Sequence, residues 1–122
     1  MLHKENLFFG RRALKSAAWE MRYAGLEILA KQGDLADIAG IETCLADGFA
    51  PVRVKALEAL ATLLAFESIP AIKNCLFYND KNDIYGSLDV RLMAKKSLDK
   101  LYLHTRSKPV NDLTKSENVE NY

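Results

Sequence analysis

The 122-residue sequence has too little of several features that define common protein classes. It has only two cysteines, which is too few for a disulfide framework. Its formal charge is +1, so no overall field attracts nucleic acid or an anionic membrane. No stretch approaches the ~20 apolar residues that span a bilayer, and the N-terminal residues lack the apolar run of a signal peptide. These absences favour a cytoplasmic location without membrane attachment.

The motifs of common catalytic chemistry are also missing. The sequence contains no glycine-rich phosphate loop, no H-E-x-x-H pair, and no serine or cysteine with a histidine placed to activate it. Cys44 and Cys75 have no further metal ligands nearby, since His3 and His104 lie at opposite ends of the chain. We therefore predict a non-enzymatic protein with no metal and no cofactor, in which both cysteines are small core residues.

Internal repetition is the main positive feature of the sequence. The pattern Val-Arg-x-x-Ala-x-x-Ala-Leu-x-x-Leu begins at Val52, recurs from Val90 with serine for the second alanine, and has a looser copy from Met21. A second pattern, Ile-x-x-Ile-x-x-Cys-Leu, begins at Ile38 and returns at Ile69. Both patterns repeat at a spacing of 31 residues until the third unit, which carries a seven-residue insertion within 77–89. A fixed period of this length indicates stacked structural repeats.

Both patterns step by three and four residues, which is the periodicity of an amphipathic helix. No window shows the sustained alternation of a strand. We predict an all-α fold, and its six helices are expected at about 3–16, 19–32, 35–46, 50–65, 69–78 and 88–104. Small residues at Gly25, Ala56 and Ala94 mark the places where two helices must approach closely.

Several residues are typical of helix ends. Gly33 can end the second helix, and Asp34 can cap the next one, with Asp37 three residues later. Pro51 and Pro70 suit the first turn of a helix. Gly48 is expected to close the third helix, and the remaining caps are predicted at Ser68 and Asp89.

The sequence divides into one helical domain and a tail. Residues 1–104 form the domain, with repeats at about 3–32, 35–65 and 69–104. Residues 105–122 are polar and contain only isolated apolar side chains, which predicts a disordered tail. The alternative is a segment that folds on a partner.

The repeated Val-Arg-x-x-Ala-x-x-Ala-Leu pattern, preceded by Ile-Pro-x-Ile-x-x-x-Leu at 69–76, resembles the HEAT-repeat family, and above all the short bacterial variety also found in phycobilin lyase subunits. The resemblance covers about residues 7–103. It implies an α-α superhelix, or solenoid, of three HEAT-like helical hairpins, in which the second helix of each pair lines the concave side. It also implies a binding scaffold. About three repeats are needed for stability, because one amphipathic pair cannot cover its own apolar face.

A candidate partner-binding surface follows from the repeat register. Tyr23, Val54 and Leu92 each come directly after a repeated arginine, at a place that is usually polar and outward-facing in repeats of this type. An apolar stripe with a charged rim is what a protein-binding groove needs. The alternative is that these side chains pack within their own repeats. The complete predicted set also includes one aromatic residue and three charged residues one turn further on: Trp19, Glu27, Glu58 and Lys96.

The repeated arginines and the aromatic residues of the first repeat each have two interpretations. Arg22, Arg53 and Arg91 form either a row of anion-binding cations or, as we favour, a set of bonds to helix-end carbonyls and neighbouring acids. Trp19 is either a binding anchor or a structural residue, which belongs to the core or, together with Phe8 and Phe9, covers the open N-terminal end; the structural role is favoured.

The insertion in the third unit does not have the ligand spacing of a calcium loop. It is either a partner-contacting extension or a passive surface loop.

The leading functional hypothesis is a protein-binding scaffold or adaptor, which includes inhibitor and immunity-type proteins. One alternative is a nucleic-acid-binding helical-repeat protein that uses the basic first repeat. Another, from the family resemblance alone, is a bilin lyase-like protein. Copies of the chain could also associate end to end, because both ends of a three-repeat stack expose apolar surface.

Overall fold

The computed structural model describes residues 2–106, with side chains from Asn6 to Thr105. Within that range it contains six α-helices and no β-strand, so the predicted all-helical class is confirmed. The α-helices are α1 (Leu2–Ala13), α2 (Trp19–Gln32), α3 (Ile38–Thr43), α4 (Ala50–Thr62), α5 (Ile69–Asn74) and α6 (Ile84–Arg106). Short 3₁₀ turns flank α3 and α5, namely η1 (Leu35–Asp37), η2 (Cys44–Ala46), η3 (Phe66–Ser68) and η4 (Cys75–Phe77). The tail predicted from sequence lies outside the described residues, apart from 105–106, which belong to α6.

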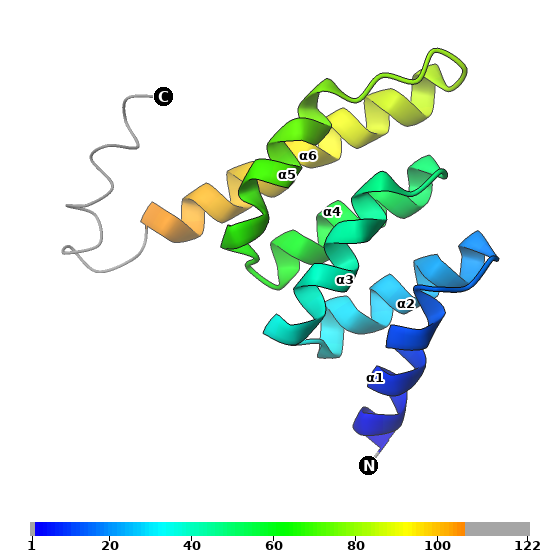
Figure 1. Cartoon of the computed structure of the whole chain (residues 1–122). Helices are drawn as coiled ribbons and strands as arrows, with labels where there is room; N and C mark the ends of the chain where they lie inside the picture. Colours follow the sequence, from blue (N-terminus) through cyan, green and yellow to red (C-terminus); the bar gives the residue numbers. More distant parts are fainter. Residues whose placement is uncertain (1, 107–122) are drawn as a thin grey trace.

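The helices lie side by side in chain order (Figure 1). α2 packs against α1 on one side and against α4 on the other, and α4 packs in turn against α6. The shorter helices α3 and α5 pack on α4 and α6 respectively. α1 and α6 therefore lie at opposite ends of the molecule, and α2, α4 and α6 form a continuous row (Figure 1).

The start of α6 corrects the predicted helix map. α6 begins at Ile84, whereas the sequence pattern predicted a start near residue 88 with Asp89 as the cap. Asp83 takes the capping position instead, because its Oδ1 accepts a hydrogen bond of 3.0 Å from the Gly86 amide. Asp89 lies inside the helix, so the second half of the insertion is helical and only the first half is a loop.

Other helix ends follow the sequence closely. Asp34 Oδ1 accepts the Ala36 amide at 2.9 Å, and Asp37 Oδ2 accepts the Asp34 amide at 3.0 Å, which confirms the predicted cap. Both prolines lie in the first turn of their helices, as predicted. The cap predicted at Ser68 is wrong, because its buried hydroxyl donates to Glu42 Oε2 at 2.6 Å. A bond to the preceding hairpin therefore replaces a local cap.

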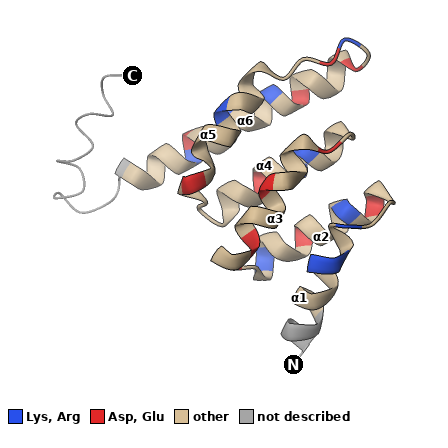
Figure 2. Ribbon diagram, in the orientation of Figure 1, with Lys and Arg blue, Asp and Glu red and all other residues tan. Residues whose placement is uncertain are grey.

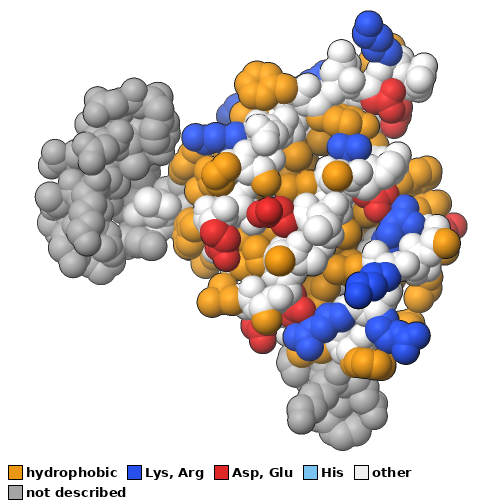
Figure 3. Space-filling model, in the orientation of Figure 1, with side chains coloured by type: hydrophobic (Ala, Val, Ile, Leu, Met, Phe, Trp, Pro, Cys, Tyr) orange, Lys and Arg blue, Asp and Glu red, His pale blue; other side chains and the backbone are white. Residues whose placement is uncertain are grey.

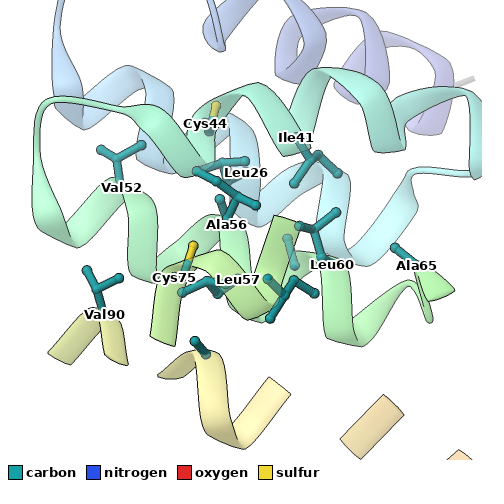
Figure 4. Close-up of a cluster of buried hydrophobic side chains, with 14 of the residues drawn as sticks. Leu26, Ile41, Cys44, Val52, Ala56, Leu57, Leu60, Ala65, Cys75 and Val90 are labelled. Atoms are coloured by element: carbon teal, nitrogen blue, oxygen red, sulfur yellow. The ribbon is translucent and has the colours of Figure 1, made fainter. Parts of the chain in front are cut away.

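The core is a single cluster that runs through the row of helices (Figure 4). Apolar side chains with no exposed surface come from α2, α3, α4, α5 and α6, and include Leu26, Leu29, Ile41, Val52, Leu57, Leu60, Ile72, Val90 and Leu101. Cys44 and Cys75 lie unpaired in the same cluster, as predicted, and burial raises the pKa of both thiols.

Small residues allow the close helix contacts that the sequence predicted. Ala56 and Ala94 are completely buried between α4 and its neighbours. A Cβ atom on Gly25 of α2 would lie 2.7 Å from the Gly10 carbonyl oxygen of α1 and 3.0 Å from the Ala13 Cβ. The two backbones therefore pack at a distance that only glycine permits.

The repeated arginines bond to the turns between helices. Arg22 pairs with Asp47 at 2.6 Å and also donates to the Ser16 and Ala17 carbonyls. Arg53 donates to the carbonyls of residues 45, 46 and 47, and Arg91 donates to the Tyr78 carbonyl at 2.8 Å. Arg22 and Arg53 thus tie the first turn of a long helix to the turn before it, and Arg91 does so from two turns inside α6, which confirms the structural interpretation.

The Arg22–Asp47 pair also links the first hairpin to the second. Burial alone would raise the pKa of Asp47, but the hydrogen bonds from Arg22 and from the Phe49 amide hold it below its usual value. Arg11 holds the pKa of Asp37 low in the same way, across a 2.6 Å ion pair between α1 and η1.

Candidate protein-binding groove

A hollow of about 830 Å³ lies between α2, α4, α6 and the loop that precedes α6. Its apolar lining comes from Tyr23, Phe49, Ala50, Pro51, Val54, Leu92 and Met93. Its charged lining comes from Asp80, Asp83, Asp89 and Lys96. Four residues of the predicted partner-binding set therefore meet in one concavity, namely Tyr23, Val54, Leu92 and Lys96.

The apolar residues differ in how much they contribute to the surface. Leu92 is 57% exposed and Phe49 is 41% exposed, so each presents apolar area to solvent. Tyr23 and Val54 are half-buried and pack against the core as well as lining the hollow. Packing within the repeats therefore accounts for part of the Tyr23 and Val54 side chains, whereas Leu92 is mostly exposed; a partner-binding role for the stripe stays a prediction.

Trp19 does not line the hollow, but its ring contacts two residues that do. Its indole stacks on the Phe49 ring at 4.6 Å between centroids, and it meets the Tyr23 ring edge-on at 6.3 Å. This half-buried position, against the core and the second hairpin, agrees with the core role favoured for Trp19 and not with a cover for the N-terminal end. Phe8 and Phe9 do not share it, because their rings are 63% and 52% exposed at the N-terminal end.

Glu27 and Glu58 do not line the 830 Å³ hollow, but Lys55 brings them together beside it. Lys55 Nζ lies 2.7 Å from Glu58 Oε1, 3.9 Å from Glu27 Oε2 and 4.9 Å from the Tyr23 ring centroid. Burial would lower the pKa of Lys55, but the hydrogen bond and charge of Glu58, together with Tyr23, outweigh it and the pKa is raised. Sequence reasoning missed Lys55, although its place one turn before Glu58 is typical of a helical ion pair.

A second hollow of about 240 Å³ continues along the seam between α4 and α6. It shares Met93 and Lys96 with the first hollow, so the two are contiguous. Its remaining lining consists of Glu58, Ala61, Thr62, Ser97 and Lys100. We refer to the two hollows together as the α4–α6 groove.

The acidic end of the groove comes from the insertion, which the sequence analysis did not assign to the site. Asp80 Oδ1 accepts the Asn82 amide at 2.9 Å, and Asp83 caps α6. Neither they nor Asp89 takes part in any ion pair among the described residues. The sequence analysis recognised the insertion as a possible partner-contacting extension, but it did not place these acids at the groove, because they reach it only through the early start of α6.

The basic first repeat is partly neutralised in the fold. Figure 2 marks Lys and Arg positions along α1 and the start of α2, and Figure 3 shows basic side chains gathered on that part of the surface. Two of these cations, Arg11 and Arg22, are held in ion pairs with Asp37 and Asp47. Arg12 lies over the Phe8 ring, with its guanidinium carbon 5.7 Å from the centroid. Fewer free cations remain for a phosphate backbone than the sequence suggests.

The described residues contain no group of three or more His, Cys, Asp or Glu side chains arranged to hold a metal ion. None of the described helices combines the length and apolar character needed to cross a bilayer. The site thus offers apolar area bordered by charge on an all-helical framework. No protein-family model, curated protein or solved structure matches the chain.

Proposed function

We propose that this chain is a non-enzymatic scaffold or adaptor that binds another protein in the α4–α6 groove. In this proposal the three hairpins are HEAT-like repeats of a short α-α superhelix, located in the cytoplasm, and the row α2–α4–α6 is its concave side. The packing of α2 on α4 and of α4 on α6 supports that arrangement. The equivalent bonds of Arg22, Arg53 and Arg91 support it independently, because they repeat from one hairpin to the next.

The observation that carries the proposal is the exposure of Leu92 and Phe49 in a hollow with a volume of about 830 Å³. Each apolar side chain that a partner covers contributes roughly 25 cal/mol per Å² of buried area. Large apolar groups in a concavity with a charged rim are typical of an interface core. The half-buried Tyr23 and Val54 supply a rigid floor, which lowers the entropy cost of binding.

The nucleic-acid alternative has less support. Its cations would have to come from the first hairpin, where Arg11 and Arg22 are engaged by aspartates. The bilin lyase-like alternative depends on the sequence resemblance alone, and the groove lining suggests no separate pigment site.

Differential affinity capture from the native host lysate tests the proposal. The tagged wild type should retain a partner that the Leu92→Glu variant loses, because the substitution removes an apolar contact and puts a carboxylate in its place that binding would have to desolvate. Leu103→Glu is the matched control, since Leu103 is 64% exposed on the same helix and does not line the groove. Far-UV circular dichroism should give the same helicity for all three proteins. Equal capture by wild type and Leu92→Glu would refute this groove as the binding surface.

A further inference from the structure

The α4–α6 groove is elongated and its two ends carry opposite charges. Gly86 and Lys100 line its two ends and are fourteen residues apart on α6, a rise of about 21 Å at 1.5 Å per residue. Asp80, Asp83 and Asp89 lie at the Gly86 end. Lys96 lines both hollows, and Lys100 lines the far one beside Glu58, whose charge is balanced by Lys55. A length of about 21 Å corresponds to roughly six residues of extended chain or fourteen residues of helix.

Apart from Glu58, the charges at both ends are free of internal ion pairs within the described part of the chain. Asp80, Asp83 and Asp89 pair with no lysine or arginine, and neither Lys96 nor Lys100 pairs with a carboxylate. The contrast with the middle of the row is clear, because Lys55 there is held between Glu58 and Glu27. Unpaired charges at a groove end set the orientation and choice of partner more than they set raw affinity.

Building on the proposed function, we infer that the groove takes a peptide segment of a partner protein with apolar anchors in its middle and a lysine or arginine at one end. The anchors cover Phe49, Val54, Leu92 and Met93. The cation lies over the three aspartates at the start of α6, and an acidic residue of the segment faces Lys96 and Lys100. A peptide of this kind matches the length of the groove, its apolar lining and the order of the charges along it.

Selection from a phage-displayed library of random twelve-residue peptides tests the inference. The full-length wild type is the bait, and peptides that also bind Leu92→Glu are removed by counter-selection, so that only groove binders remain. We expect the enriched sequences to combine two or more large apolar residues with a lysine or arginine toward one end. Synthetic copies of the best sequences are then titrated by fluorescence anisotropy.

Substitutions in the acidic end give the decisive comparison. Asp80→Asn and Asp89→Asn, made together, remove two charges and keep an amide oxygen that can accept the Asn82 amide. Asp83 is left intact because it caps α6. The double variant should bind the basic peptides about two- to thirtyfold more weakly, as expected for two solvent-exposed charge pairs. Asp99→Asn is the control, since Asp99 lies on α6 outside the groove and pairs with Lys95.

The inference is overturned if no groove-dependent peptides emerge, if the enriched peptides lack a basic residue, or if the double variant binds them as tightly as Asp99→Asn does. These failures are distinguishable from failure of the proposed function. Lysate capture that still depends on Leu92 would then leave the binding surface in place and exclude only this class of partner segment.

Discussion

Replacing Gly25 with alanine should destabilise the protein, although the same change usually stabilises a helix. Gly25 lies inside α2, where glycine-to-alanine substitution contributes about 1 kcal/mol of helix propensity. The new Cβ would lie 2.7 Å from the Gly10 carbonyl oxygen, which belongs to the backbone of α1 and cannot rotate away. Overpacking of a tight contact costs about 1–3 kcal/mol. The net effect is a loss of about 0–2 kcal/mol, accompanied by separation of α1 from α2.

Gly40→Ala is the matched control for this prediction. Gly40 lies in α3, and a Cβ there would meet only Leu14 Cδ1 at 3.6 Å, an ordinary van der Waals contact. The propensity gain is then unopposed, so Gly40→Ala should stabilise the protein by up to about 1 kcal/mol. The two variants carry the same chemical change, but we expect opposite effects on the stability of the fold.

Urea denaturation followed by circular dichroism at 222 nm measures both variants against wild type. A difference of 1 kcal/mol also corresponds to a shift of about 4 °C in the thermal midpoint. If Gly25→Ala stabilises the protein as much as Gly40→Ala does, the helices must separate at little cost, and the argument from close α1–α2 contact fails.

Three further predictions concern charge, the core and the thiols. The pKa of Asp47 is held low in the fold, so its pairing with Arg22 stabilises the protein above the unfolded pKa of about 4 and is lost as pH falls through the folded value. The urea midpoints of wild type and Asp47→Asn should therefore differ at pH 7 and converge toward pH 3; a constant gap would contradict this. Leu60→Ala, at a fully buried site, should cost about 2–5 kcal/mol in the same assay, and a loss below 1 kcal/mol would mean that the core refills the space. Cys44 and Cys75 should react slowly with Ellman's reagent until urea is added, because burial raises the pKa of both thiols and blocks access; rapid reaction in native buffer would show that the cluster opens.

The helix map was predictable where local chemistry and repeat pattern agreed. α2 and α4 begin where the sequence placed them, because each starts just before a repeated apolar-arginine pair. The Asp34 cap could be identified because its partner, Asp37, is only three residues away. Ser68 could not be assigned in the same way, since its partner Glu42 belongs to the previous hairpin and is 26 residues distant in sequence.

The candidate site was predictable only in part. Tyr23, Val54 and Leu92 share one repeat position, so their common face followed from the register. Phe49 was missed because it lies at a helix boundary outside the apolar pattern, and its stacking on the Trp19 ring is a tertiary contact that no local pattern predicts.

The amino-acid sequence by itself determined that residues 2–106 form helices and no strand, where most helices begin, and which residues face a common core, because these properties depend on contacts within a few residues or on a fixed period. Tertiary structure decided which charges are neutralised and which remain free. It paired Arg22 with Asp47, placed Lys55 between two glutamates, and brought the aspartates of the insertion beside Leu92. Those outcomes depend on how one hairpin packs on the next. A local sequence pattern does not specify which side chains from different hairpins come within bonding distance.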